Sequence, residues 1–140
     1  MLDEKIMKEI YELVEDTRDI IVCSIGEQGY PNAKAMFKVS HDGLKTFYFS
    51  TNVSSNRTQQ FMKNSKACLY FFESKKINGL MLIGDMEILL DNETKQNFWQ
   101  DGWEMYYPLG ATDPDYCIAK FTSISGNYYN SLKKYIFRVE

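Results

Sequence analysis

The chain has 140 residues, of which 44% are hydrophobic and 25% charged, and its formal net charge is -3. This length predicts a single domain over residues 1–140, able to bury a core without disulfides or metals. The mild acidity argues against nucleic acid as a main partner. No run approaches the roughly 20 apolar residues of a membrane-spanning helix. We therefore expect a cytoplasmic protein that binds neither nucleic acid nor membranes.

The N-terminal segment, residues 2–16, predicts an amphipathic helix. Ile6, Ile10 and Leu13 recur at helical spacing, and the acidic residues near its start favour the positive end of the helix dipole. A charged amphipathic segment differs from a secretory signal, which has a basic region followed by an apolar core. We therefore expect a structural helix here and no signal peptide.

Residues 19–51 predict a three-stranded meander. "DIIVCSI" is a short β-branched run, and "AKAMFKVS" and "KTFYFST" alternate in hydrophobicity. The "HDG" sequence at His41–Gly43 predicts a hairpin turn, because Asp-Gly tolerates the positive φ angles of such turns. The expected strands are 19–25, 33–40 and 45–51.

The rest of the chain predicts two helices and four strands. Gly84, in the middle of a long strand, predicts a bulge or a close backbone approach. Strands that mostly follow each other in sequence favour an antiparallel sheet. The expected fold is mainly β (α+β), a six- to seven-stranded antiparallel split barrel with peripheral helices. The expected helices are 54–64 and about 91–107, and the expected strands are 67–74, 80–90, 116–125 and 133–140.

The sequence offers little for metal or hydrolytic chemistry. His41 is the only histidine and lies in a turn, so neither a metal cluster nor a Ser-His or Cys-His pair is indicated. Cys23, Cys68 and Cys117 each lie in an apolar segment without a C-x-x-C spacing, which favours three buried, reduced thiols. We predict no metal site and identify no catalytic residue.

Two carboxylates, Asp113 and Asp115, flank Pro114. Acid–base catalysis would need both of them in a pocket at a suitable distance. In a D-P-D loop we favour the simpler interpretation, a turn with solvated charges.

The junction between the strand ending at Thr51 and the following helix is rich in hydroxyl and amide side chains and is closed by Arg57. Such residues commonly cap helices. They also suit a phosphate, because a helix start presents free N–H groups and arginine can bind two phosphate oxygens. Lys34, in the preceding strand, would lie near the same junction in a hairpin. From the residues alone, the cap is the favoured interpretation and the phosphate site stays open.

Aromatic and apolar side chains have two open interpretations. Met36, Phe37 and the aromatic residues of 47–49 suit either the walls of a flat ligand or a barrel core. Trp99 and Trp103, spaced i and i+4, predict one aromatic helix face that serves core packing, a protein interface or a ligand lid.

Four segments together resemble the pyridoxamine 5′-phosphate oxidase-like FMN-binding split barrels, in the general stress protein 26-like branch. They cover about residues 15–125 in the family's order. The segments are "GYPNAKAMFKV" (Gly29–Val39), "DGLKTFYFSTNVSSNRTQQFMKN" (Asp42–Asn64), "LMLIGDMEIL" (Leu80–Leu89) and "FWQ…YYPLGATDPDY" (Phe98–Tyr116).

This resemblance implies an FMN-binding homodimer with flavins at the subunit interface. The strand Lys34–Phe37 would line the flavin ring, largely through its backbone, and Lys34 would reach the phosphate. Ser50 and Thr51 would contact the ring or the ribityl chain, and the partner chain would add its own contacts. The implied cofactor-binding residues are Lys34, Ala35, Met36, Phe37, Ser50, Thr51, Ser55, Asn56 and Arg57, with Gly79, Leu80 and Tyr107 from the partner.

The chain departs from the family pattern at several positions. Lys34 stands where the family usually has arginine, and Arg57 where it usually has lysine, which changes phosphate geometry. Val39 stands where true pyridoxamine phosphate oxidases carry a basic residue, and their C-terminal tryptophan and substrate-binding arginine are missing. We expect no vitamin B6 oxidase activity.

The implied function is an FMN-dependent oxidoreductase of unknown substrate related to stress response. The alternatives are a non-catalytic flavin carrier, a flavin-free dimeric module, or a heme or deazaflavin protein.

Overall fold

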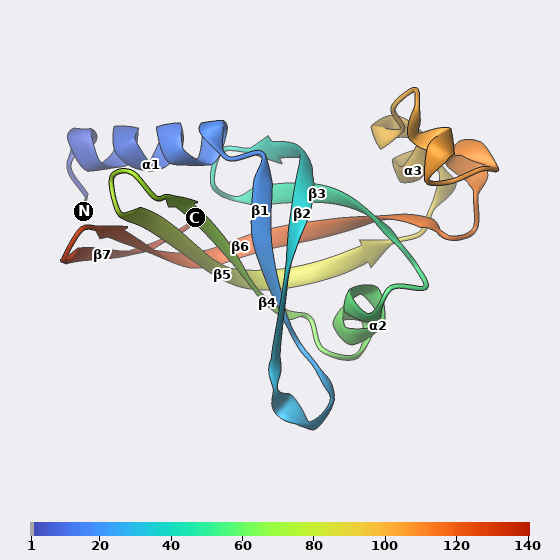
Figure 1. The fold of residues 1–140 in the computed structure, drawn as a ribbon, viewed down its shortest axis with the longest axis horizontal. Helices are drawn as coiled ribbons and strands as arrows, with labels where there is room; N and C mark the ends of the chain where they lie inside the picture. The colour runs from blue at the N-terminus through green and yellow to red at the C-terminus, as the bar shows by residue number, and fades with distance from the viewer. Residues whose placement is uncertain (1) are drawn as a thin grey trace.

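A computed structural model describes residues 2–140, with three α-helices and seven strands (Figure 1). The first strand and most other elements lie where the sequence pattern places them. The helices are α1 (Glu4–Asp16), α2 (Asn56–Lys63) and α3 (Asn92–Phe98), and the strands are β1 (Asp19–Ile25), β2 (Pro31–Asp42), β3 (Thr46–Asn52), β4 (Lys66–Glu73), β5 (Asn78–Leu89), β6 (Tyr116–Asn130) and β7 (Lys133–Arg138).

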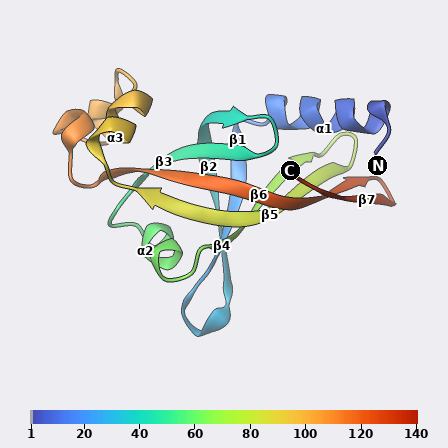
Figure 2. The ribbon, with the colours of Figure 1, turned by 180° about the vertical axis from the view of Figure 1, so that it is seen from behind.

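The strands form one antiparallel sheet in the order β3-β2-β1-β4-β5-β6-β7. β3 also pairs with β6 along Thr46–Asn52, so the first six strands close into a barrel. β7 is an additional strand that pairs with the far part of β6 (Figure 2). The predicted antiparallel barrel with peripheral helices is confirmed. None of the helices within residues 2–140 has both the length and the apolar character needed to cross a bilayer.

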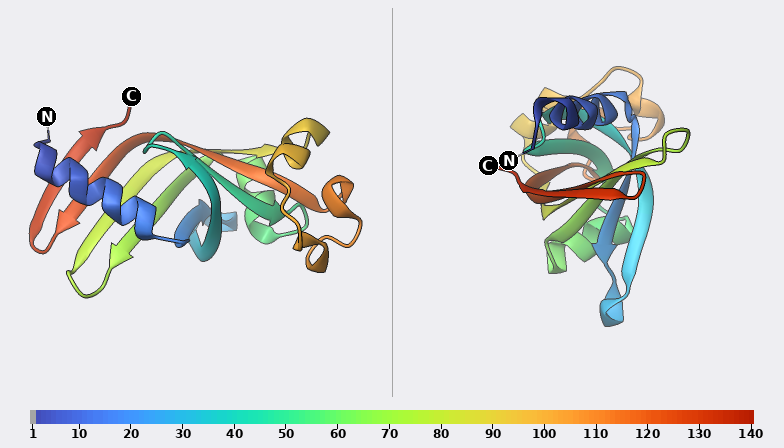
Figure 3. Two further views of the ribbon diagram at one scale, coloured as in Figure 1. Left: turned by 90° about the horizontal axis from the view of Figure 1, so that it is seen from above. Right: turned by 90° about the vertical axis from the view of Figure 1, so that its left-hand side faces the viewer.

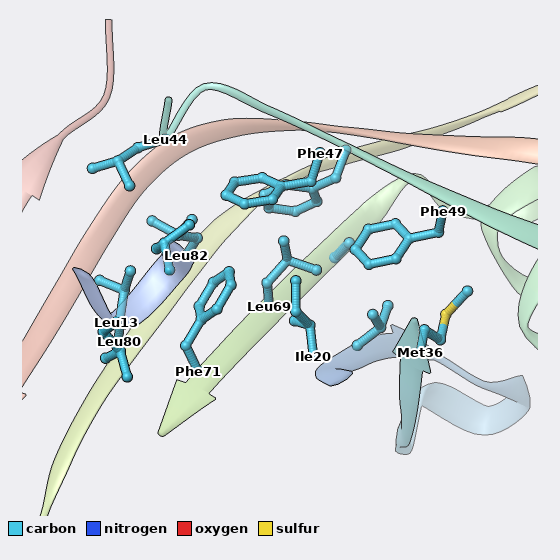
Figure 4. Packing of buried hydrophobic residues seen from close by; sticks show 14 of the residues in the cluster. Leu13, Ile20, Met36, Leu44, Phe47, Phe49, Leu69, Phe71, Leu80 and Leu82 are labelled. Atoms are coloured by element: carbon cyan, nitrogen blue, oxygen red, sulfur yellow. The ribbon is translucent and has the colours of Figure 1, made fainter. Parts of the chain in front are cut away.

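The barrel interior is filled by alternate side chains of all six strands (Figure 4). Phe47 and Phe121 are fully buried, and their rings lie 6.3 Å apart between centroids. Ile10 on α1 is equally buried, because this helix lays its apolar face on the sheet. The alternation that predicted the strands therefore reflects a closed core with one side of each strand inside.

The helices occupy different ends of the barrel (Figure 3). Both termini lie at one end, and α2 and α3 lie at the other. α1 begins at its N-cap Asp3, whose carboxylate accepts the backbone N–H of Ile6 at 2.8 Å. The features that position the candidate site are therefore gathered at the end opposite the termini.

Two glycines have the roles expected from the sequence. Gly43, in the β2–β3 turn, has a φ of 54°, which suits the predicted Asp-Gly hairpin. At Gly84 the β5–β6 register shifts, and a Cβ atom there would overlap the carbonyl oxygen of Thr122. The predicted bulge and close approach are both confirmed.

Two predicted boundaries are wrong. The helix expected to reach Tyr107 ends at Phe98, since Trp99 is extended and Gly102 has a left-handed φ of 98°. β6 continues past the predicted end at Ser125, because Gly126 leaves room for the ring of Phe137 on β7. The segment after α3 is therefore a folded loop with short 3-10 turns.

Candidate cofactor site at the start of helix α2

Ser55 is the N-cap of α2. Its hydroxyl accepts the backbone N–H of Thr58 at 3.2 Å. The Thr58 hydroxyl donates to the Asn52 carbonyl at 2.7 Å, so the hydroxyl contact between Ser55 and Thr58 uses the proton of Ser55. The cap interpretation is confirmed at this residue. The cap satisfies Thr58 and leaves the N–H groups of Asn56 and Arg57 available at the helix start.

Asp115 explains much of the polar character of the junction. Its carboxylate accepts the Asn52 side chain at 2.8 Å and the Ser54 N–H and hydroxyl at 2.9 and 3.1 Å. These donors are therefore already hydrogen-bonded to a carboxylate of the protein itself. Sequence reasoning missed this role, because Asp115 lies far from the junction along the chain.

Asp113, the other carboxylate of the D-P-D loop, is buried rather than solvated. It forms the expected turn by accepting the N–H groups of Leu109 and Asp115 at 3.1 and 2.9 Å. The prediction of a solvated charge is therefore wrong for Asp113, whereas the predicted turn is confirmed. Backbone donors take the place of water here.

Arg57 is the one cationic side chain of the junction, and its guanidinium is only partly satisfied. One terminal nitrogen donates to the Thr51 hydroxyl at 3.4 Å, whereas Nε is buried and finds no hydrogen-bond partner within the described residues 2–140. Burial lowers the pKa of Arg57 from its usual value, and the nearby Tyr107 phenol opposes this. A buried, unpaired donor of this kind suits an anionic ligand that supplies the missing acceptor.

Tyr107 lies beside the junction of its own chain. Burial raises the pKa of its phenol, and a hydrogen bond with Ser50 counteracts part of that rise. Its ring packs 4.8 Å from the Tyr116 ring between centroids. The expected contact of Tyr107 with a partner's flavin stays a prediction, but within this chain its phenol lies near Ser50 and Arg57.

The segment after α3 is anchored over the site by aromatic packing. The Trp99 and Trp103 rings lie 5.2 and 6.0 Å from Tyr116. The Tyr116 hydroxyl donates to the Lys95 carbonyl at 2.7 Å, and the buried Lys95 ammonium donates to the Asp113 carbonyl at 3.0 Å. These contacts hold the loop containing Tyr107 against the end of the barrel.

The predicted flavin-lining residues of β2 divide between its two faces. Met36 is buried in the core, so only its backbone faces outward. Lys34, Ala35 and Phe37 are exposed, and Arg18 lies over the Phe37 ring at 5.0 Å. The expectation that this strand lines a flavin mainly through its backbone stays a prediction.

Lys34 is not brought to the junction by the β2–β3 ladder, which ends where Lys38 faces Phe49. It shares a β2 face with Asn32, whose amide donates to Gln60 of α2 at 3.3 Å. Gln60 lies one helical turn after Arg57. Lys34 therefore stands on the side of β2 that meets α2, and its contact with a phosphate stays a prediction.

Gly79 and Leu80, expected to approach a partner's flavin, are both buried. The Leu80 side chain packs into the barrel core (Figure 4), and Gly79 leaves room for the Tyr70 hydroxyl. Only their backbone atoms are available for such a contact, which stays a prediction. Within residues 2–140, no group of three or more His, Cys, Asp or Glu side chains is placed to hold a metal.

The stability of the junction is expected to depend on pH through Asp115. Hydrogen bonds from Asn52 and Ser54 lower the pKa of this carboxyl, so its contribution is present above the unfolded pKa of about 4 and is lost as pH falls through the folded value. Asp115→Asn should reduce the loss of melting temperature between pH 6 and pH 3, by a small amount because the carboxylate is exposed to solvent. Thermal melts of both proteins measure this. If the melting temperatures of the two proteins fall equally between pH 6 and pH 3, the role given to Asp115 is wrong.

The model of the pyridoxamine 5′-phosphate oxidase-like family matches residues 5–139. The chain belongs to the pyridoxamine 5′-phosphate oxidase-like family. A search of curated proteins finds none that matches.

Among solved structures of this family, a Clostridium acetobutylicum protein described as related to general stress protein 26 is 49% identical. It aligns over 99% of this chain and 97% of its own, with a TM-score of 0.90. General stress protein 26 from Bacillus anthracis is 16% identical, over 96% and 98% of the two chains, with a TM-score of 0.76. A pyridoxamine 5′-phosphate oxidase-related, FMN-binding protein from Nostoc punctiforme is 10% identical, over 100% and 93%, with a TM-score of 0.68. The last two share the fold.

Proposed function

We propose that this protein binds FMN, with the FMN phosphate at the start of α2. The observation that carries the proposal is the buried Nε of Arg57, which has no hydrogen-bond partner among residues 2–140. An anion at that point would accept hydrogen bonds from Arg57 and from the free backbone N–H groups at the start of α2. Membership in the pyridoxamine 5′-phosphate oxidase-like family and the FMN-binding relative from Nostoc punctiforme support the choice of ligand.

The residues around Arg57 suit the rest of such a ligand. The hydroxyl of Thr51 lies within reach of the guanidinium, and Ser50 lies beside Tyr107. Ser55 contributes mainly by capping α2, since its hydroxyl is already engaged by Thr58. When bound, FMN supplies the capacity for hydride or electron transfer, while the protein binds and orients it.

The activity that fits best is an FMN-dependent oxidoreductase related to stress response, acting on an unidentified substrate. No side chain at the junction is arranged as an obvious acid–base pair, and redox chemistry carried by FMN does not require one. The second candidate is a flavin carrier without turnover. We also propose that the protein has no vitamin B6 oxidase activity, because Val39 stands where true pyridoxamine phosphate oxidases carry a basic residue.

A second copy of the chain is proposed to complete the site as a homodimer. Three large apolar side chains stand exposed in the loop that follows α3, on either side of the buried Tyr107. Met105, Tyr106 and Leu109 are 77%, 63% and 71% exposed. Apolar groups concentrated beside a ligand site commonly mark an interface, and a second copy covering them would also shield the flavin from water.

Flavin titration tests this proposal. We expect FMN to bind more tightly than riboflavin by at least tenfold, because riboflavin lacks the phosphate that Arg57 would hold. Fluorescence quenching of each ligand measures both constants. Equal affinity for the two ligands would contradict the phosphate site, and tighter binding of heme or a deazaflavin would contradict the choice of FMN.

Anaerobic reduction separates the two candidate activities. If the protein is an oxidoreductase, NADH or NADPH should bleach the bound FMN absorbance near its visible maximum. Free FMN at the same concentration is the control for direct reduction. Failure of every common reductant would favour the carrier.

A further inference from the structure

Cys23 on β1 and Cys68 on β4 lie directly opposite each other in the antiparallel ladder. Residues opposed in this way project to the same face of the sheet. Their neighbours Val22 and Leu69, which are also opposed, are almost completely buried inside the barrel. The two thiols therefore lie together on the outer face, where both are partly exposed.

The spacing of such a pair suits a disulfide. Opposed residues of antiparallel strands have Cα atoms about 4.5–5.5 Å apart, and disulfides accept Cα separations of about 4.4–6.8 Å. Burial, together with the charge of the adjacent Cys23 and a hydrogen bond with it, raises the pKa of the Cys68 thiol to about 12. The thiols are therefore already close enough to interact.

The surroundings favour oxidation over other thiol chemistry. Ala33 faces Cys23 from β2, and Ile83 faces Cys68 from β5. Neither neighbour offers a third ligand for a metal, and two thiols alone do not complete a zinc site. A small oxidant can reach the pair because both side chains are partly exposed.

We propose that Cys23 and Cys68 form a reversible dithiol–disulfide site that small peroxides oxidise. The Cys23 thiolate attacks a peroxide oxygen and becomes a sulfenic acid as hydroxide leaves. The Cys68 sulfur then attacks the Cys23 sulfur and gives up its proton, and the sulfenic oxygen leaves as water. With hydrogen peroxide, two thiols lose two electrons and the peroxide becomes two waters. Because burial raises the pKa of the Cys68 thiol, Cys68 is a poor first nucleophile, and we assign the first attack to Cys23.

Cys117 provides the internal control. It is fully buried on β6, its Sγ lies 3.5 Å from the Thr51 carbonyl, and burial raises its pKa to about 11. It pairs with Thr51 across the β3–β6 ladder rather than with another cysteine. Oxidation of the Cys23–Cys68 pair should therefore leave the Cys117 thiol unoxidised.

The native protein is treated with hydrogen peroxide, denatured in acid, and its remaining thiols are alkylated and counted by intact mass. We expect the parent and Cys117→Ser to lose two alkylatable thiols each, and dithiothreitol to restore them. Cys23→Ser and Cys68→Ser should form no intramolecular disulfide. Peptide mapping of the oxidised parent should show residues 23 and 68 linked, a result that requires no variant to fold.

Three alkylatable thiols in the treated parent, or disulfides only between chains, would overturn the proposal. So would a linkage involving Cys117. The thiol count does not depend on flavin or on oligomeric state, so this inference stands apart from the proposed FMN site and is tested on protein without added FMN.

Discussion

Arg57→Ala is expected to weaken FMN binding by about 1.5–3 kcal/mol, the scale of a lost charge-assisted hydrogen bond. That corresponds to a roughly 10- to 150-fold rise in Kd. The reason is that Arg57 is the cation whose buried Nε has no hydrogen-bond partner in the part of the chain that the structure describes. Fluorescence titration of FMN measures the change.

Two variants make the Arg57 result specific. Arg138→Ala removes an exposed arginine from β7, at the other end of the barrel, and should leave the Kd unchanged. Arg57→Lys keeps the charge but loses the planar fork, so an intermediate loss is expected. Riboflavin affinity should be the same in the parent and in all three variants. If Arg57→Ala binds FMN as tightly as the parent, the phosphate lies elsewhere.

Gly84→Ala is expected to destabilise the fold by about 2–3 kcal/mol, since overpacking of a tight interior forces the backbone to move. The added methyl group would overlap the Thr122 carbonyl oxygen and approach the Phe121 ring. Backbone atoms cannot rotate away as a side chain can. Urea denaturation followed by circular dichroism measures the loss.

Glu87→Ala is the matched control for Gly84→Ala. It lies on the same strand, but its side chain is exposed, and surface substitutions usually change stability by less than about 0.5 kcal/mol. A Gly84→Ala protein as stable as the parent would mean that the β5–β6 ladder can shift at the bulge without cost.

The sequence predicted the barrel well because its signals are local. The alternation of apolar and polar residues predicted the positions of the strands. Gly84, in the middle of a long apolar run, predicted the bulge. The helix predicted through Tyr107 failed because Gly102 adopts a left-handed conformation that residue spacing does not reveal. Trp99 and Trp103 still meet, at 5.7 Å between ring centroids, but through a loop rather than along one helix face.

The candidate site was predicted only in part. Ser55 and Arg57 could be identified because strand-to-helix junctions have a local sequence signature. The engagement of Ser54 by Asp115 and the packing of Tyr107 beside Ser50 depend on contacts between distant segments. No pattern within the junction itself reveals them. The Cys23–Cys68 pair was missed for the same reason, because strand register decides it.

The β3–β6 ladder that closes the barrel also bears on how the protein folds. It joins Thr46 to Thr122 and continues to the pairing of Asn52 with Tyr116. Contacts between such distant segments carry a large loop-closure cost and form slowly. β3 leads directly into the junction that ends at Arg57. The proposed FMN site therefore depends on the most non-local strand pairing of the sheet, and newly made chains would acquire the proposed affinity for FMN only once that pairing is complete.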